Sequence, residues 1–116
     1  MILGFIGTGK ISSSIIYGIF KSKLKIKRIY ISSRNKNIAK KLKNQFRQVK
    51  ILKDNQEIID KSSIIILGLT PLVGNKILSR LKFSLLNGIA WLFCIIHDFR
   101  FYRHRKNFIL HYLWHF

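Results

Sequence analysis

Gly7, Gly9 and Ser12 have the spacing of a turn that holds the diphosphate of a dinucleotide. An apolar run precedes them and a helical pattern follows them, which is the order that such a turn requires. Gly7 can make the tight turn out of a strand, Gly9 lets the backbone approach the phosphates, and Ser12 is small enough for close helix packing. Thr8 and Lys10 can add a hydroxyl and a cation, and the helix N-terminus would direct free N–H groups at the anion.

The phosphate-binding loop of nucleoside triphosphatases is a competing interpretation of the same segment. Gly4, Gly9 and Lys10 match its spacing, but Ile11 stands where a Ser or Thr must ligate magnesium. The later apolar run at 64–67 also ends without the Asp that would help to hold the metal. We therefore prefer the dinucleotide interpretation.

The second expected strand ends in polar residues that bear on the choice of cofactor. NAD sites place an Asp or Glu there to accept from the ribose 2′-hydroxyl, whereas this chain has Ser32-Ser33-Arg34-Asn35. A carboxylate would repel a 2′-phosphate, but hydroxyls, a guanidinium and an amide can bind it. We expect NADPH rather than NADH, with Ser33, Arg34 and Asn35 on the 2′-phosphate side. The alternative is that these residues only form a turn and cap the next helix.

The hydrophobic pattern predicts the elements that position these residues. Expected strands lie at 2–6, 29–31, 49–51 and 64–67, and expected helices at 10–21, 35–46, 55–60 and 72–81. This alternation is typical of an α/β fold, here a Rossmann-like doubly wound parallel sheet with right-handed crossovers. The crevice of such a sheet lies between the carboxyl ends of the first and fourth strands, where 7–11 and 68–71 would meet.

Composition limits the function classes. The net charge of the 116 residues is +18, from 22 Lys and Arg against 4 Asp and Glu, so a non-enzymatic basic module that binds nucleic acid or an anionic membrane is the alternative function. We do not favour it, because the cations are spread through every segment. The single Cys94 excludes an internal disulfide, and no secretory signal is visible, so we expect a cytoplasmic protein. The longest apolar stretch, 85–96, is too short to span a membrane.

Over residues 1–83 the chain resembles pyrroline-5-carboxylate reductase. Four pieces carry the resemblance: Gly4-Phe5-Ile6-Gly7-Thr8-Gly9-Lys10-Ile11 with the residues that follow to Gly18, Ile31-Ser32-Ser33-Arg34-Asn35, Asp54-Asn55-Gln56-Glu57, and Ile65-Ile66-Leu67-Gly68-Leu69-Thr70-Pro71. The resemblance implies that residues 1–83 are an NADP-binding Rossmann domain. It also implies an oxidoreductase of proline biosynthesis that reduces the small molecule 1-pyrroline-5-carboxylate to L-proline with NADPH.

The resemblance assigns cofactor-binding residues by position. They are Ile6, Gly7, Thr8, Gly9, Lys10 and Ile11 for the pyrophosphate, Ser33, Arg34 and Asn35 for the 2′-phosphate, Asn55 for the adenosine, and Leu69, Thr70 and Pro71 for the nicotinamide side. The chain departs from the family at Thr70, where the family usually has Lys. No catalytic residue is assigned, and no metal is expected.

Residues 84–116 form a divergent aromatic and basic tail that holds all four histidines and both tryptophans. The family continues instead through a further strand and then a helical domain, which forms the homodimer and much of the substrate pocket. We interpret the tail as a chain translated in another frame or as a truncated product. Two weaker interpretations are a zinc site at Cys94, His97, His104, His111 and His115, and an aromatic and basic surface at 99–106 for single-stranded nucleic acid or a membrane.

Overall fold

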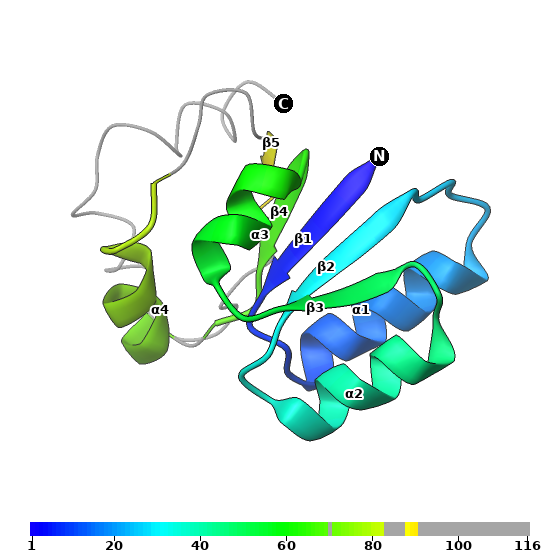
Figure 1. The fold of residues 1–116 in the computed structure, drawn as a ribbon, viewed down its shortest axis with the longest axis horizontal. Helices are drawn as coiled ribbons and strands as arrows, with labels where there is room; N and C mark the ends of the chain where they lie inside the picture. Colours follow the sequence, from blue (N-terminus) through cyan, green and yellow to red (C-terminus); the bar gives the residue numbers. More distant parts are fainter. Residues whose placement is uncertain (70, 83–87, 91–116) are drawn as a thin grey trace.

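The computed structural model describes residues 1–69, 71–82 and 88–90. In chain order the elements are β1 (Ile2–Ile6), α1 (Lys10–Lys21), β2 (Arg28–Ser32), α2 (Lys36–Gln45), β3 (Val49–Leu52), α3 (Asn55–Lys61), β4 (Ile64–Leu67), α4 (Pro71–Leu78) and β5 (Gly88–Ala90). The strands form one parallel sheet in the order β3-β2-β1-β4-β5. The predicted Rossmann-like doubly wound sheet is confirmed, with β1 at its centre (Figure 1).

Helices cover both faces of the sheet, and each face has its own core. Leu3 and Phe5 of β1 pack with α1 and α2, where the buried helix residues are Ile16, Ala39 and Leu42. The other core combines Ile6, Ile58, Ile59, Ile65, Leu67 and Leu69, with α4 side chains packed against it. Because both faces are buried, β1 and β4 are continuous apolar runs rather than alternating ones.

An aromatic cluster joins α1 to the end of α2. The rings of Phe20 and Phe46 stack with centroids 4.1 Å apart, and Tyr17 meets the ring of Phe46 edge-on at 5.3 Å. The Tyr17 hydroxyl donates to Oε1 of Gln45 at 2.6 Å. These contacts hold the C-terminal end of α2 against α1, while its N-terminus follows β2 and so lies at the carboxyl edge of the sheet.

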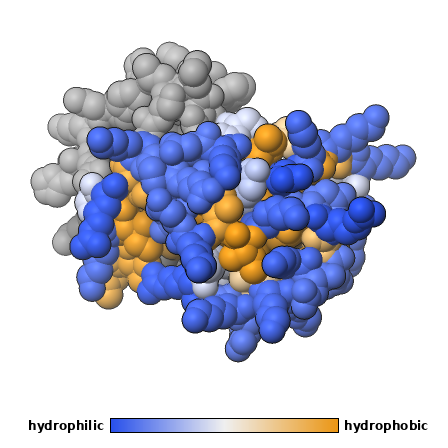
Figure 2. Space-filling view, in the orientation of Figure 1, coloured by the Kyte–Doolittle hydropathy of each residue, from blue (hydrophilic) through white to orange (hydrophobic). Residues whose placement is uncertain are grey.

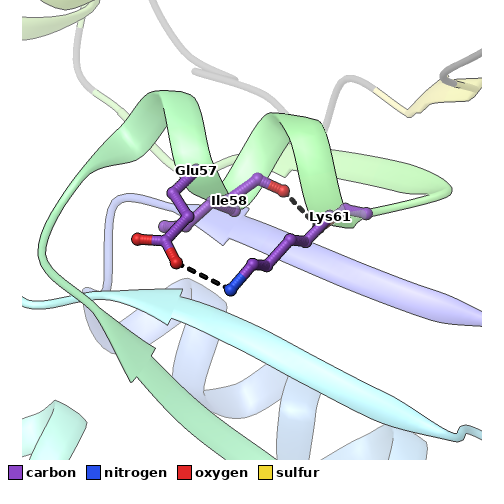
Figure 3. A network of polar contacts seen from close by, with 4 residues as sticks. Glu57, Ile58 and Lys61 are labelled. Carbon is purple, nitrogen blue, oxygen red and sulfur yellow. Dashed lines mark hydrogen bonds and ion pairs between the residues drawn. The ribbon is translucent and has the colours of Figure 1, made fainter.

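Helix α3 lies against the centre of the sheet and close to its backbone. A Cβ at Gly4 would clash with side-chain atoms of Ser62 and Ile58, so a glycine is needed where α3 crosses β1. Where α3 faces β2, Nζ of Lys61 lies 2.7 Å from Oε1 of Glu57 and 5.9 Å from the centre of the Tyr30 ring (Figure 3). The hydrogen bond and charge of Glu57 raise the pKa of the exposed Lys61 above its usual value.

The predicted elements agree with the structure to within a few residues, apart from three differences. Asn35 and Phe46 flank α2 as caps instead of lying inside it. The last predicted helix begins at Pro71 and already ends at Leu78. Strand β5, parallel to β4, was not predicted, because three residues are too few to show a periodic pattern. It lies beyond residue 83, where the expected domain ends.

The surface in Figure 2 is mostly hydrophilic, with small hydrophobic patches between the charged side chains. Within the described ranges, no helix has the length and hydropathy needed to cross a bilayer. The same ranges contain no cluster of three side chains suited to a metal ion. The zinc and nucleic-acid hypotheses for the tail fall on residues 91–116, outside the described residues.

Candidate functional site

Gly7 makes the turn between β1 and α1 and is required by the fold itself. Its φ is +93°, a conformation that residues with a side chain rarely adopt. A Cβ at this position would also clash with the carbonyl group of Gly68 at the end of β4. Beside it, the Gly68 N–H donates to the carbonyl oxygen of Ile6 at 2.8 Å. The turn is therefore packed directly against the segment that follows β4.

Gly9 occupies the N-cap of α1, and its packing differs from that of Gly7. Its φ is −105°, which any residue can adopt, and a Cβ would meet no atom of the described residues within 4 Å. A glycine has no side chain with which to cap, and the first turn of α1 contains no acidic residue. The N–H groups of this turn thus face an open space with the positive end of the helix dipole behind them.

Ser12 contributes more than small size to the turn. It is only 1% exposed, and its hydroxyl donates to the carbonyl oxygen of Gly7 at 2.6 Å. A Cβ on Gly68 would clash with this hydroxyl oxygen. Ser12 therefore holds the glycine turn closed while α1 packs against the end of β4.

The hydroxyls of Thr8 and Ser32 are used within the protein. Oγ1 of Thr8 donates to the carbonyl oxygen of Ser32 at 2.8 Å and lies 3.0 Å from Oγ of Ser32. Oγ of Ser32 also accepts the N–H of Gly7 at 3.1 Å. A phosphate contact from Thr8 would therefore come from its backbone N–H and not from the expected hydroxyl, and the Ser32 hydroxyl faces the turn.

A cavity of about 690 Å³ opens at the carboxyl edge of the sheet, beside this turn. Its lining combines the glycine turn, the start of α2 and the segment from β4 to α4: Gly7, Thr8, Gly9, Arg34, Asn35, Lys36, Asn37, Gly68, Leu69 and Val73. The structure thus brings together six of the predicted site residues, which come from three separate segments. Sequence reasoning placed Gly68 at this crevice but missed Lys36, Asn37 and Val73. Lys36 and Asn37 could have been found, because the first turn of α2 must point to the same edge as Arg34.

The remaining predicted site residues do not line this cavity. Ile6 is buried at the end of β1, Lys10 and Ile11 are exposed in the first turn of α1, and Ser33 is half-buried beside Arg34. Asn55 begins α3 after the short loop that follows β3, and Pro71 begins α4. Thr70 lies outside the described residues.

Asn35 takes the capping role that was the alternative to phosphate binding. Its Oδ1 accepts the N–H of Ile38 at 3.4 Å at the start of α2. The same side chain lines the cavity, and its Nδ2 is not used by the cap. Capping and a contact to an anion are therefore compatible for this residue.

The charge distribution makes the cavity positive. Residues 1–53 contain no Asp or Glu, and the acidic residues of the described part are Asp54, Glu57 and Asp60, all next to or within α3. Arg34 and Lys36 line the cavity, and the N-termini of α1 and α2 lie beside it. Such a site favours a ligand with more than one negative group.

Comparison with known proteins assigns the chain to a family. Residues 2–88 match the family described as NADP oxidoreductase coenzyme F420-dependent. The chain belongs to this family. A search of curated proteins with this chain finds no match. The family match covers the glycine turn, the Arg34 loop and the segment after β4, and it extends to the start of β5.

Solved structures agree with the family assignment. A 1-pyrroline-5-carboxylate reductase from Streptococcus pyogenes is 29% identical, with a TM-score of 0.63 over 78% of this chain and 33% of that one. A 3-hydroxyisobutyrate dehydrogenase from Mycobacterium tuberculosis, 14% identical, has a TM-score of 0.54 over 69% of this chain and 26% of that one, and shows the fold alone. The family match and the Streptococcus structure confirm the resemblance seen in the sequence. The chain spans only about a third of the length of the Streptococcus reductase.

The residues of this cavity fit a pyridine dinucleotide. The open space above Gly9 would admit a diphosphate that a side chain would exclude, and the N-terminus of α1 offers it N–H donors. Arg34 lines the same cavity with a positive charge, and Leu69 gives it an apolar wall beyond the glycine turn. The chain thus belongs to a family of pyridine-nucleotide oxidoreductases, and its cavity fits a cofactor of that class.

Proposed function

We propose that this chain is the NADPH-binding part of an oxidoreductase of the pyrroline-5-carboxylate reductase type. One observation carries the proposal: a single cavity joins the N-terminus of α1, which has no side-chain cap, to Arg34 at the end of β2, with no carboxylate in its described lining. The likeness to the Streptococcus reductase supports the choice of substrate class. The reaction would be reduction of 1-pyrroline-5-carboxylate to L-proline, in the cytoplasm.

Each segment has a distinct task in this proposal. The turn from Ile6 to Ile11 binds the pyrophosphate through backbone N–H groups, because the Thr8 hydroxyl is already bonded to Ser32. Ser33, Arg34 and Asn35 bind the 2′-phosphate, with Lys36 adding positive charge. Asn55 contacts the adenosine, and Leu69, Thr70 and Pro71 lie on the nicotinamide side.

The bound cofactor would supply a hydride for the imine carbon of the cyclic substrate. The part of the chain described here holds and orients the cofactor, and Leu69 and Val73 keep water from one wall of the cavity. The chain spans about a third of the length of the Streptococcus enzyme, and the resemblance to the reductase family implies that a helical domain of the family supplies much of the substrate pocket. We therefore expect dinucleotide binding, rather than turnover, from the chain alone.

The proposal is tested by titrating the purified chain with NADPH and with NADH, followed by the fluorescence of the reduced nicotinamide. We expect tighter binding of NADPH. Arg34→Ala should weaken NADPH binding about tenfold or more, because it removes charge-assisted hydrogen bonds to a phosphate, and should change NADH binding little.

Arg47→Ala is the matched control, since it removes the same exposed charge after the far end of α2. Its NADPH affinity should stay within a factor of about two of the wild-type value, as expected for one distant surface charge. If the wild-type chain binds neither dinucleotide, the proposed function is wrong. If NADPH and NADH bind equally well, the role given to Arg34 is wrong.

A basic module for nucleic acid or an anionic membrane remains the second candidate, favoured by the absence of acidic residues from positions 1–53. Titration with a single-stranded oligonucleotide at several salt concentrations tests it. Contacts to many phosphates would give an affinity that falls steeply with salt, with no preference between NADPH and NADH. A shallow salt dependence together with a preference for NADPH would exclude this candidate.

A further inference from the structure

Thr8 and Ser32 form a closed ring of hydrogen bonds. Each hydroxyl has only one proton to donate, and this identifies the donor of each bond. A carbonyl oxygen can only accept, so the one hydroxyl proton of Thr8 is donated to the Ser32 carbonyl oxygen at 2.8 Å. The 3.0 Å contact between the two hydroxyl oxygens must then use the proton of Ser32. The free lone pair of the Ser32 oxygen accepts the Gly7 N–H at 3.1 Å. Every hydroxyl proton in the ring is thus used.

The ring is buried and begins where the sheet ladder stops. Thr8 is 3% exposed and Ser32 is 5% exposed. The last paired residues of β1 and β2 are Phe5 and Ile31, so the ladder ends one residue before Ser32. Beyond the last ladder pair, the ring connects the segment after β1 to the end of β2. It joins the glycine turn to Ser32, the residue that precedes the Ser33–Asn35 loop.

We infer that Ser32 is a positioning residue that sets the distance between the pyrophosphate turn and the 2′-phosphate loop, and so tunes the preference for NADPH over NADH. This inference rests on the proposed function. Ser32 is not among the residues that line the cavity, and its hydroxyl is bonded to Gly7 and Thr8. It acts through Arg34, two residues further on, which lines the cavity with Gly7 and Gly9.

The ring has a specific consequence for binding. NADPH bridges both segments, with its diphosphate at the turn and its 2′-phosphate at the loop, whereas NADH lacks the second contact. Loss of the ring would let the loop move relative to the turn, so it should weaken NADPH binding more than NADH binding. A residue that only stabilises the fold would change both affinities by the same factor.

The test measures NADPH and NADH affinity of the full chain for the wild type, Ser32→Ala and Ser32→Thr. Ser32→Ala should lower the ratio of NADPH to NADH affinity about fivefold, the factor that corresponds to one ordinary hydrogen bond. Ser32→Thr keeps the hydroxyl and should restore most of the ratio. Amide hydrogen exchange gives a second readout, since the Gly7 N–H should exchange faster in Ser32→Ala.

Ser62→Ala is the matched control. Ser62 is also buried, at 6% exposed, and its hydroxyl donates to the carbonyl oxygen of Ile58 at 2.6 Å. It lies between α3 and β4, at the amino edge of the sheet and away from the cavity. This variant should lose stability yet keep the ratio of NADPH to NADH affinity.

The outcomes separate the inference from the proposed function. If the wild type prefers NADPH and Ser32→Ala keeps that preference, or weakens both dinucleotides equally, the inference is overturned and the proposed function stands. If the wild type binds neither dinucleotide, both fail. Should Ser32→Ala not fold, Thr8→Val tests the same ring with little change in volume, and an unchanged ratio in that variant overturns the inference.

Discussion

Substitution of the two glycines of the turn should have different effects. Gly9→Ala is the sharper test of dinucleotide binding at this turn. Its backbone conformation (φ −105°, ψ −167°) suits alanine, and the added Cβ would meet open space. An alanine at the N-cap is less favourable than glycine by up to about 1 kcal/mol. Reduced freedom of the unfolded chain offsets this by about 0.4–1 kcal/mol. We therefore expect the free energy of unfolding to change by less than about 1 kcal/mol.

The same methyl group should strongly weaken dinucleotide binding. It projects into the space that the diphosphate would occupy above the first turn of α1. Displacing the diphosphate would break at least one hydrogen bond from a backbone N–H to a charged oxygen, which contributes about 1.5–3 kcal/mol. The dissociation constant for NADPH should rise about 10- to 150-fold, and NADH binding should weaken by a similar factor, since both share the diphosphate.

Gly7→Ala provides the contrast. It places a Cβ at a φ of +93° and against the Gly68 carbonyl group. Backbone strain of about 1–3 kcal/mol and overpacking of about 1–3 kcal/mol should remove a large part of a domain stability of about 5–15 kcal/mol. Thermal unfolding followed by circular dichroism, with NADPH titration of the folded variants, separates the two effects. Wild-type NADPH affinity in a folded Gly9→Ala variant would refute the assignment of the diphosphate to this turn.

Two further predictions concern stability. Phe46→Ala should lower the free energy of unfolding in urea by about 2–3 kcal/mol, since the ring of this half-buried residue stacks on Phe20 and meets Tyr17 edge-on; an unchanged midpoint would contradict the packing of α1 on α2. Glu57→Gln should leave the unfolding midpoint at neutral pH almost unchanged, because the Lys61–Glu57 pair is exposed. Glu57 raises the pKa of Lys61 above 10.5. The small contribution of the ion pair to the stability of the fold is therefore complete below pH 10.5 and is lost as the pH rises through the raised pKa. A clear difference between wild type and variant at pH 7, or one that grows with alkaline pH, would contradict this.

Local pattern was sufficient to predict most of the fold. A parallel strand buried on both faces needs apolar residues at every position, as in the run from Ile64 to Leu67. The helix α2 buries Ala39 and Leu42 and exposes its lysines, which is a helical period. Strand β5 escaped prediction because its pairing with β4 depends on the neighbouring strand and not on its own three residues.

The candidate site was predicted less completely than the fold. Spacing alone identified Gly7, Gly9 and Arg34 as residues of one site, and the cavity contains all three. Spacing could not show that the fold itself requires Gly7 but does not require Gly9. It also assigned the Thr8 hydroxyl to a phosphate, whereas the structure bonds that hydroxyl to Ser32.

The amino-acid sequence by itself determined the order of strands and helices, the position of the glycine turn and the absence of a carboxylate after the second strand. These features depend on residue type and on spacing within one segment, so they are visible in the chain. Only the tertiary structure decided which hydroxyls are bound internally, which loops share a cavity and where a side chain would clash. The atoms involved belong to residues far apart in the chain, such as Thr8 and Ser32, and strand register brings them within hydrogen-bonding distance.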